Sequence, residues 1–449
     1  MVAFASLILS LVVGTQPVEL LVGDGVVAVE LRLDGRLVER LDGPPWSTRL
    51  DVGEELAPRR LEAVALDAEG GELDRAEQWL NLPRPAAEVS VVLENLSSGR
   101  GAVARVAWRN LFGGPPTGVK ASLDGRSLEV DDPRRIALPP FDPASLHLLR
   151  VDLLFPEGVV STAEVTFGGV FGEKVSTDLT AVPLVLEKGS RLPPPRELRR
   201  WFELAEGSPE VLAVEEGPVE LVAVVSDAAR GPIEELVEIG RARSRRLGPL
   251  QGVARLDREH HLRFVNSRPL GLLDGGVTVQ IFPASQVFDR RDSGLLRLLH
   301  EVRPKLRIGP ERLTDSVAAA ALAAARQNRR RGVLLVLGRE GADASGFGAD
   351  RVRRYLARVR VPLTVWRIGE RGPDASPWPV DEVVESPWEL AAAYRRLAAR
   401  LERQRLVWLR GAHLPQGVEL TPAARGVRLA GVEAVRAQGA AAGSGARGR

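Results

Sequence analysis

The chain has 449 residues, of which 44% are hydrophobic and 27% charged, a balance typical of folded soluble domains and not of disordered chains. It has no cysteine, which excludes disulfides, thiolate zinc sites, iron–sulfur clusters and thiol nucleophiles. A formal net charge of +2 excludes the broad basic surface that would predict nucleic acid as a partner.

The chain opens on an apolar run, Met1–Gly14 (MVAFASLILSLVVG). The run is shorter than the roughly 20 residues that a membrane-spanning helix needs, and its length is typical of the hydrophobic region of a secretory signal. Residues 1–15 are therefore predicted to be a signal peptide of a periplasmic, cell-surface or secreted protein without a stable membrane anchor. No Lys or Arg precedes the run, so a buried N-terminal strand is the alternative.

Short alternating strands follow, with turn residues between them. The strand Val27–Leu33 leads into Asp34-Gly35, a dipeptide typical of a tight β-hairpin turn. The sequence LDGR at Leu33–Arg36 recurs at Leu123–Arg126, a spacing of 90 residues that fits one β-sandwich. We therefore predict two tandem sandwiches, residues 16–84 and 85–187.

The segment Val29–Ala68 (VELRLDGRLVERLDGPPWSTRLDVGEELAPRRLEAVALDA) resembles bacterial Ig-like domains. The resemblance implies a β-sandwich in which Trp46, after Pro44-Pro45, is the core aromatic residue. Ig-like modules can also stack carbohydrate on exposed indole rings, so envelope carbohydrate binding is an alternative function. The tryptophans near Pro-rich turns are the candidates for exposure: Trp201, Trp378 and Trp388.

Residues 188–217 include Pro193-Pro194-Pro195, which predicts a stiff, extended linker. Residues 218–436 then alternate apolar strands with amphipathic helices, a pattern that favours a doubly wound, mostly parallel sheet. The expected strands are 221–225, 277–282, 333–337, 361–366 and 406–409. The expected helices begin near Gly231-Pro232, Leu313, Val352 and Ser386-Pro387, and the Ala/Gly/Arg-rich residues 437–449 are predicted to be a disordered tail.

The predicted fold class is thus multidomain β plus α/β, with tandem Ig-like β-sandwiches followed by the doubly wound sheet. In this second half, Asp227 directly follows the first strand, a helix starts at Leu313, and the strand RRGVLLVLG leads into a loop. This order resembles von Willebrand factor type A domains, in particular the divergent bacterial VWFA-related proteins. The resemblance implies a metal ion held by an Asp-x-Ser-x-Ser loop, a Thr before the later helix and an Asp after the fourth strand.

The sequence departs from that ligand pattern at most positions. Asp227 matches the first Asp, but Ala229 and Gly231 stand where the two Ser are expected. Glu311 stands at the Thr position, and Gly338 or Arg339 at the last Asp. The metal site is therefore predicted to be degenerate, and no cofactor is expected.

Two alternatives stay open at this site. Glu340 and Asp343 could replace the missing carboxylate and restore metal-dependent adhesion. Asp227 could instead bond the backbone amides of the Gly231-Pro232 turn at the start of a helix.

The sequence contains no known catalytic motif: no nucleophile elbow, phosphate loop or dinucleotide fingerprint occurs. The five His are scattered along the chain, except for the adjacent His260 and His261, which on a strand would point to opposite faces and could not bind one metal ion together. An enzyme without a recognisable site is a further alternative. The prediction is a non-catalytic scaffold that binds an unidentified protein partner, and no nucleic acid, through the loops at the carboxyl ends of the strands. The residues expected on this loop face are Asp227, Arg230, Glu311, Thr314, Arg339, Glu340 and Asp343.

Overall fold

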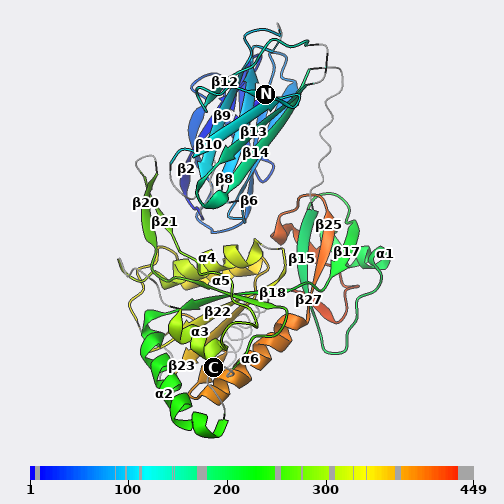
Figure 1. Cartoon of the computed structure of the whole chain (residues 1–449). Coiled ribbons are helices and arrows are strands. Elements are labelled where there is room, and N and C mark those ends of the chain that lie inside the picture. The colour runs from blue at the N-terminus through cyan, green and yellow to red at the C-terminus, as the bar shows by residue number, and fades with distance from the viewer. Residues whose placement is uncertain are drawn as a thin grey trace, which may run out of the picture. The chain divides into compact units, whose positions relative to one another are not determined.

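The computed structural model forms two compact units, Met1–Ser176 with Leu273–Thr278 and Thr177–Leu272 with Val279–Arg449 (Figure 1). The structure describes residues 1–5, 11–85, 87–96, 99–110, 114–143, 145, 147–168, 179–247, 254–274, 277–302, 309–326, 328–339, 341–369 and 376–432. The predicted tail, residues 437–449, lies outside these ranges.

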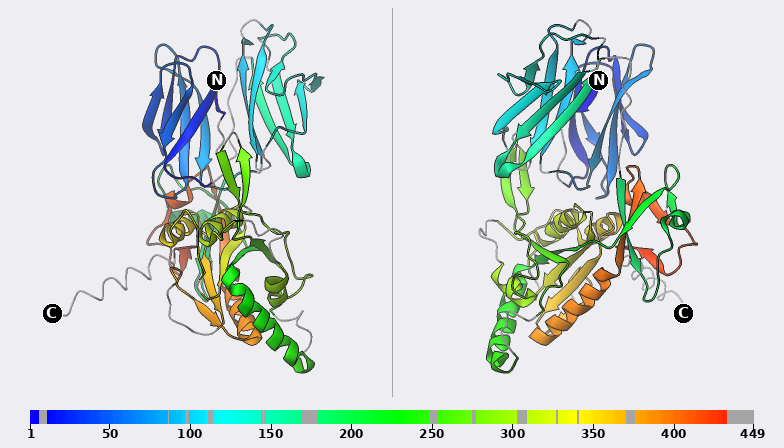
Figure 2. Two further views of the ribbon diagram at one scale, coloured as in Figure 1. Left: turned by 90° about the vertical axis from the view of Figure 1, so that its left-hand side faces the viewer. Right: turned by 45° about the vertical axis from the view of Figure 1, so that its right-hand side comes forward.

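The first unit holds two β-sandwiches, drawn in blue and in cyan to green in Figure 2. The first sandwich packs a sheet in the order β1-β2-β5 on a sheet in the order β4-β3-β6-β7. Its strands are β1 (Val2–Phe4), β2 (Thr15–Val22), β3 (Ala28–Leu33), β4 (Arg36–Leu41), β5 (Ser47–Asp51), β6 (Arg59–Leu66) and β7 (Glu72–Leu80). Trp46, predicted to be the core aromatic residue, is half-buried and packs against the core between the sheets.

The second sandwich repeats this connectivity, strand for strand. Its sheets have the orders β12-β9-β8 and β11-β10-β13-β14. The strands are β8 (Ala87–Glu94), β9 (Val103–Asn110), β10 (Gly118–Leu123), β11 (Arg126–Leu128), β12 (Arg135–Ala137), β13 (His147–Leu154) and β14 (Val160–Phe167). The prediction of tandem Ig-like β-sandwiches is confirmed at this level of architecture.

The repeated LDGR sequence forms equivalent hairpins, β3–β4 and β10–β11. Asp34 and Gly35 have φ of 52° and 79°, and Asp124 and Gly125 have φ of 51° and 78°. A two-residue turn with positive φ at both positions has the twist that antiparallel neighbours need, and Asp-Gly tolerates it.

The start of the chain has a structural role in the first sandwich. β1 pairs with β2, and the side chains of Val2 and Phe4 are buried in the core. Val12 is also buried, while residues 6–10 lie outside the described ranges. This arrangement is the buried N-terminal strand that was the alternative to a signal peptide.

Asn81 fastens this segment to the sandwich. Its side-chain Oδ1 accepts from the Val12 N–H at 2.7 Å, and its Nδ2 donates to the carbonyls of Val12 (3.0 Å) and Ala57 (2.8 Å). Asn81→Leu is expected to lower the free energy of unfolding by about 2–4 kcal/mol, because buried backbone groups lose their partners. Asn95→Leu is the matched control, since Asn95 also has positive φ but is exposed. Urea unfolding compares the two, and equal losses would show that backbone conformation alone is at stake.

The second unit is built on a five-stranded parallel sheet in the order β19-β18-β22-β23-β24. Helices α2, α3 and α6 cover one face, and α4 and α5 lie on the other (Figure 1). The strands are β18 (Val219–Val225), β19 (His260–Val265), β22 (Arg330–Leu337), β23 (Leu363–Ile368) and β24 (Glu382–Val384); the helices are α2 (Arg230–Leu247), α3 (Leu295–Glu301), α4 (Leu313–Ala325), α5 (Ala349–Arg358) and α6 (Pro387–Glu402). An α/β part with a parallel sheet is therefore confirmed.

Two predicted strands do not belong to that sheet. β21 (Val277–Ile281) pairs only with β20 (Leu270–Asp274) among the described residues. β25 (Gln404–Arg410) runs antiparallel to β15 (Leu179–Leu186), more than 200 residues earlier in the chain. An apolar run identifies a buried strand but carries no information about its partner, which is why both were placed in the parallel sheet.

The predicted linker 188–217 is instead folded. Its elements are α1 (Pro195–Leu198), the 3-10 turn η3 (Arg199–Trp201), β16 (Phe202–Leu204) and β17 (Val211–Glu215). β17 completes the antiparallel sheet β17-β25-β15-β27 with β27 (Val427–Leu429), and β16 pairs with β26 (Val418–Leu420). Leu198 and Phe202 enter the core of this small sheet, so burial of apolar side chains outweighs the extended preference of the proline run.

Residues 179–187 therefore belong to the second unit and not to the second sandwich, which was predicted to extend to residue 187.

In the described parts of the chain, each helix is too short or too polar to cross a lipid bilayer.

Candidate functional site

The order of the parallel sheet defines where a ligand site is expected. Numbered along the chain, its strands run 2-1-3-4-5, so the order reverses between β18 and β22. Doubly wound sheets bind ligands at this switch point, outside the carboxyl ends of the strands. Ser226 and Asp227 follow β18 there, and Gly338 and Arg339 follow β22.

At the switch point the loops after β18 and β22 lie in close backbone contact. The 3-10 turn η4 (Asp227–Ala229) follows β18. Gly338 approaches this turn so closely that a Cβ added to it would lie 1.9 Å from the carbonyl oxygen of Ala228. The Ser226 N–H also donates to the carbonyl of Val336 at 2.9 Å. An aspartate at 338, one of the two positions that the family resemblance allows for its last ligand, has no room.

Asp227 forms an ion pair with Arg268, a residue that no sequence motif indicated. Arg268 Nε donates to Asp227 Oδ2 at 2.7 Å, and Nη2 lies 2.6 Å from the same oxygen. Ser226, not Asp227, caps the following turn, because its Oγ accepts from the Ala228 N–H at 3.2 Å. The alternative role of Asp227 as a cap of the Gly231-Pro232 turn is therefore wrong.

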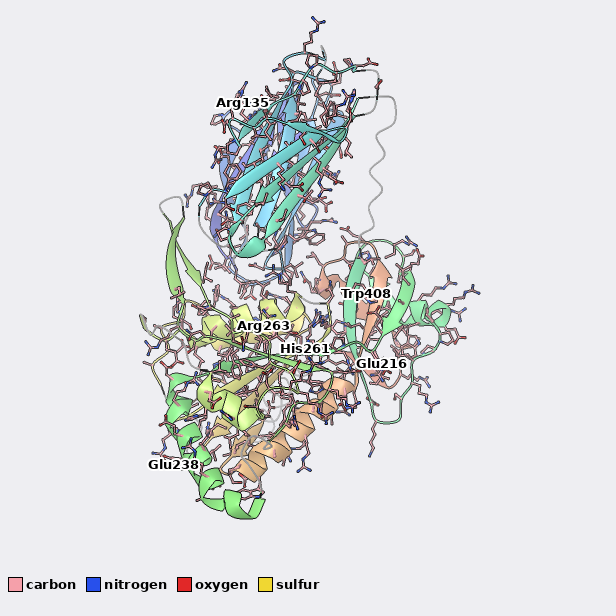
Figure 3. All side chains as sticks on the ribbon, in the orientation of Figure 1. Arg135, Glu216, Glu238, His261, Arg263 and Trp408 are labelled. Carbon is pink, nitrogen blue, oxygen red and sulfur yellow. The ribbon has the colours of Figure 1, made fainter. Side chains whose placement is uncertain are left out.

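Arg268 was missed because β19 was missed. The sequence of β19, HHLRFV, alternates polar and apolar residues and lacks the continuous apolar run of a central parallel strand. Figure 3 labels two of its outward-facing side chains, His261 and Arg263. Recognising β19 would have placed Arg268 just beyond its carboxyl end, beside Asp227.

Glu311 lies beneath this ion pair. Its Oε1 accepts the backbone N–H of Asp227 at 2.8 Å, and its side chain also bonds Ser267. The residue is 7% exposed, and this burial raises the pKa of its carboxyl group, against the two hydrogen bonds that favour the ionised form. The structure therefore places Asp227 in contact with two side chains, Glu311 through its backbone N–H and Arg268 through its carboxylate.

Asp343 and Thr314 form a second group at the start of α4. Asp343 accepts from the N–H groups of Leu313 (2.9 Å) and Thr314 (3.1 Å) and from the Thr314 hydroxyl (2.7 Å). It also accepts from the N–H and hydroxyl of Ser345 at 3.0 and 2.6 Å. Asp343 thus caps α4 from a distant loop, where its negative charge is favoured by the helix dipole.

These hydrogen bonds lower the pKa of Asp343, although partial burial opposes the shift. A lowered carboxyl pKa gives stability that is present above the unfolded-state value and is lost as the pH falls through the folded-state value. Asp343→Ala is therefore expected to cost about 1–2 kcal/mol at neutral pH, a difference that shrinks below pH 4. Urea unfolding at several pH values measures this, with the exposed Asp350→Ala as control; a pH-independent difference would contradict it.

The remaining predicted residues do not join these groups. Arg230 turns toward α3 and donates to the carbonyls of Leu299 and Val302, both at 3.1 Å. Arg339 is exposed, and Glu340 lies outside the described residues. Both carboxylate oxygens of Asp343 already accept hydrogen bonds from protein groups, which argues against its use as a replacement metal ligand.

The tryptophans do not form an exposed platform in the described structure. Trp378, predicted to be exposed, is buried, and Trp201 is half-buried against the core of the small sheet. Trp388 is 38% exposed but lies on α6, not on a sandwich. In the sandwiches, Trp46 and Trp108 pack on the cores, and Arg134 covers the Trp108 ring at 4.4 Å.

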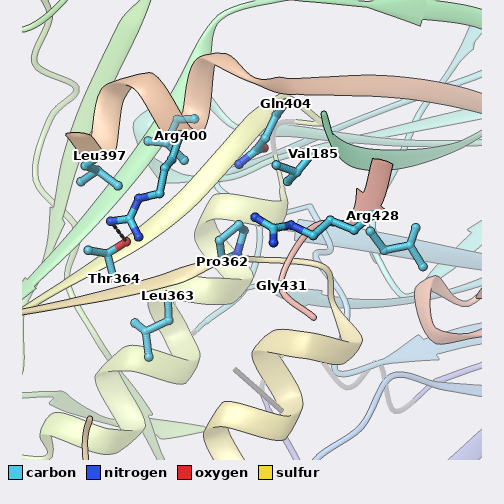
Figure 4. Close-up of a pocket in the computed structure, with 11 residues that line it drawn as sticks. Val185, Pro362, Leu363, Thr364, Leu397, Arg400, Gln404, Arg428 and Gly431 are labelled. Atoms are coloured by element: carbon cyan, nitrogen blue, oxygen red, sulfur yellow. Dashed lines mark hydrogen bonds between the residues drawn. The ribbon is translucent and has the colours of Figure 1, made fainter. Parts of the chain in front are cut away.

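A small cavity lies between α6, β23 and the antiparallel sheet (Figure 4). Arg400 Nη2 donates to Thr364 Oγ1 across it at 3.4 Å. Its volume of about 30 Å³ suits a water molecule and is far below the several hundred Å³ of sites for organic ligands.

Comparison with known proteins does not assign a family. No family model and no curated protein matches the chain. Among solved structures, the fibronectin(III)-like modules of Clostridium thermocellum CbhA are 14% identical, with 38% of this chain and 94% of that chain covered and a TM-score of 0.16. Proximal thread matrix protein 1 from the mussel byssus is 12% identical over 46% of this chain and 50% of its own, with a TM-score of 0.27.

A β-glucuronidase of glycoside hydrolase family 2 is 11% identical over 38% of this chain, with a TM-score of 0.16, and this chain spans 20% of its length. Similarities this weak carry no functional argument.

Proposed function

We propose that this protein is a non-catalytic binding protein whose loop face, at the carboxyl ends of β18, β22 and the neighbouring strands, recognises a protein partner without a metal ion. The ion pair between Asp227 and Arg268 carries this proposal. The carboxylate that the family resemblance assigns to a cation is bound by a guanidinium instead, and a positive charge at that place disfavours a metal ion.

Closure of the switch point supports binding over catalysis. The contact of Ala228 with Gly338 lies at the switch point, where a doubly wound sheet holds a substrate, and narrows the space between the two loops there. The loops present charged side chains to solvent: Arg339 is exposed, and Asp227 and Arg268 are partly exposed. Such a face gives specificity for a partner of complementary charge. Within this proposal the second unit is von Willebrand A-like, on the strength of its sheet order and the position of Asp227.

A thermal melt tests whether the loop face is independent of metal. The full chain is expected to melt within about 1 °C in millimolar magnesium, manganese or calcium and in EDTA, because an ion that binds only the folded state would raise the melting temperature. A rise of several degrees that disappears in Asp227→Ala would overturn the metal-free mechanism.

Partner capture tests the loop face itself. The tagged full chain serves as bait beside a variant with the ion pair reversed, Asp227→Arg/Arg268→Asp, and Arg339→Glu. We expect at least one protein to be lost with this variant yet kept with Arg126→Glu, a matched exposed charge on β11. Identical recovery from the loop-face variant and the native chain would refute the proposed surface.

A further inference from the structure

A separate cluster of polar side chains lies at the amino end of β19, away from the loop face at the carboxyl ends of the strands. His260 is the first residue of β19, Asp257 precedes it by three residues, and Glu402 is the last residue of α6. One potential ligand atom from each lies within 4.8 Å of the other two. Among the described residues, this is the one group of three His or acidic side chains with such spacing.

The His260 ring is held in one orientation but not fully satisfied. Its side chain is 3% exposed, and Nδ1 lies 3.1 Å from the hydroxyl of Tyr394. The other ring nitrogen, Nε2, is buried and has no hydrogen-bond partner in the described structure, with Glu402 Oε1 at 3.9 Å. A buried polar atom without a partner is costly, so its retention needs an explanation.

The two carboxylates are available to a ligand. Among the described residues, neither the Asp257 nor the Glu402 carboxylate accepts a hydrogen bond, and their side chains are 51% and 55% exposed. Asp257 Oδ2 lies 3.8 Å from Nδ1 of His260. Exposure lets an ion enter from solvent and lets both side chains approach it.

The guanidinium of Arg330, next to this cluster, is already engaged. Arg330 donates to Glu259 Oε2 at 3.0 Å and to the carbonyls of Gly217 and Glu402 at 2.7 and 3.2 Å. The negative charge of Glu259 partly neutralises the guanidinium of Arg330. Because Arg330 bonds the backbone carbonyl of Glu402 and not its side chain, the Glu402 carboxylate stays available.

We infer that Asp257, His260 and Glu402 form a binding site for a divalent transition-metal ion of the zinc class, with Nε2 of His260 as the nitrogen ligand. One imidazole and two carboxylates suit zinc and its neighbours, whereas magnesium and calcium prefer oxygen ligands alone. Three protein ligands leave a coordination position for water. Tyr394 supports the site by holding the ring through Nδ1; when Nδ1 carries the proton and donates to the Tyr394 hydroxyl, Nε2 keeps a free lone pair for the ion.

One of the two adjacent histidines at the start of β19, His260, takes part in this site. The adjacent His261 is directed to the other face of the sheet and bonds Arg329 Nη1 at 2.9 Å (Figure 3). The site therefore uses one histidine and depends on the fold, since Glu402 lies 142 positions after His260.

Zinc titration of the metal-free full chain by calorimetry tests this site. We expect one equivalent to bind, with the affinity reduced at least tenfold in Asp257→Asn and in Glu402→Gln. Both substitutions are isosteric and on exposed side chains, so the fold is retained. His261→Gln is the matched control and is expected to bind zinc as the native chain does.

Three outcomes would overturn the inference: no zinc binding by the native chain, unchanged affinity in the double variant Asp257→Asn/Glu402→Gln, or loss of binding in His261→Gln. Asp227→Asn separates this site from the loop face. Zinc binding that is lost in Asp227→Asn would contradict both proposals. Zinc binding that is weakened in Glu402→Gln but unchanged in Asp227→Asn supports the new site and leaves the metal-free loop face intact.

Discussion

Replacing Gly338 with alanine is expected to unfold or severely destabilise the second unit, with a loss of at least about 3 kcal/mol. The added Cβ would lie 1.9 Å from the carbonyl oxygen of Ala228, 2.2 Å from its carbonyl carbon and 2.5 Å from the Ala229 nitrogen. These are backbone atoms of η4, which is held to β22 through Ser226, so they cannot move aside as a flexible side chain can.

Gly348→Ala is the control for this substitution. Gly348 precedes α5, has φ of −79°, and a Cβ added to it would meet nothing within 4 Å. Urea unfolding followed by tryptophan fluorescence reports on the second unit through the buried Trp366 and Trp378. If the free energies of unfolding of Gly338→Ala and Gly348→Ala differ by less than about 1 kcal/mol, the backbone of Ala228 can move away from position 338 at little cost.

The same contact shows which features of the loop face are visible in the sequence and which are not. That Ala229 and Gly231 stand where the resemblance would call for serines is visible in the sequence. The close approach of Gly338 to the Ala228 carbonyl is a contact between loops about 110 residues apart, which no local pattern encodes. The guanidinium of Arg268 that pairs with Asp227 is likewise a property of the assembled sheet edge.

Local rules predicted the fold where the local backbone decides it. The Asp-Gly turns needed only positive φ at two successive residues. The start of α6 needed only Ser386, whose Oγ accepts from the Glu389 N–H at 3.3 Å. β18 and β22 are buried along their whole length, and residues 221–225 and 333–337 within them are continuous apolar runs.

The misassigned elements share a different physical cause. β25 has the same apolar character as β18, yet it pairs with β15 and completes an antiparallel sheet. β19 lies at the edge of its sheet, where one face is partly exposed and polar residues alternate with apolar ones. Strand partners and sheet edges are set by long-range packing, so the residues that depend on them, including Arg268, His260 and Glu402, could not be grouped from the sequence.

Asp315→Ala is expected to lower the free energy of unfolding by about 3 kcal/mol, a larger loss than that from Asp343→Ala in the facing loop. Asp315 is buried in the first turn of α4, where its carboxylate accepts from the N–H groups of Gly346 (3.0 Å) and Phe347 (2.9 Å). Arg312 Nη2 lies 2.8 Å from the same carboxylate. Removing it strands two amides and a guanidinium, whereas Asp343 is solvent-accessible and water can replace part of its bonding.

Hydrogen exchange separates this anchoring role from a general loss of stability. In Asp315→Ala the amides of Gly346 and Phe347 are expected to lose protection, because they lose their acceptor, while the Asp227 amide stays protected by Glu311. Asp350→Ala, an exposed acid at the start of α5, is the control and should leave all three unchanged. Equal protection of Gly346 in both variants would show that the loop is held by contacts other than Asp315, and the loop face would then owe its rigidity to the Asp343 group alone.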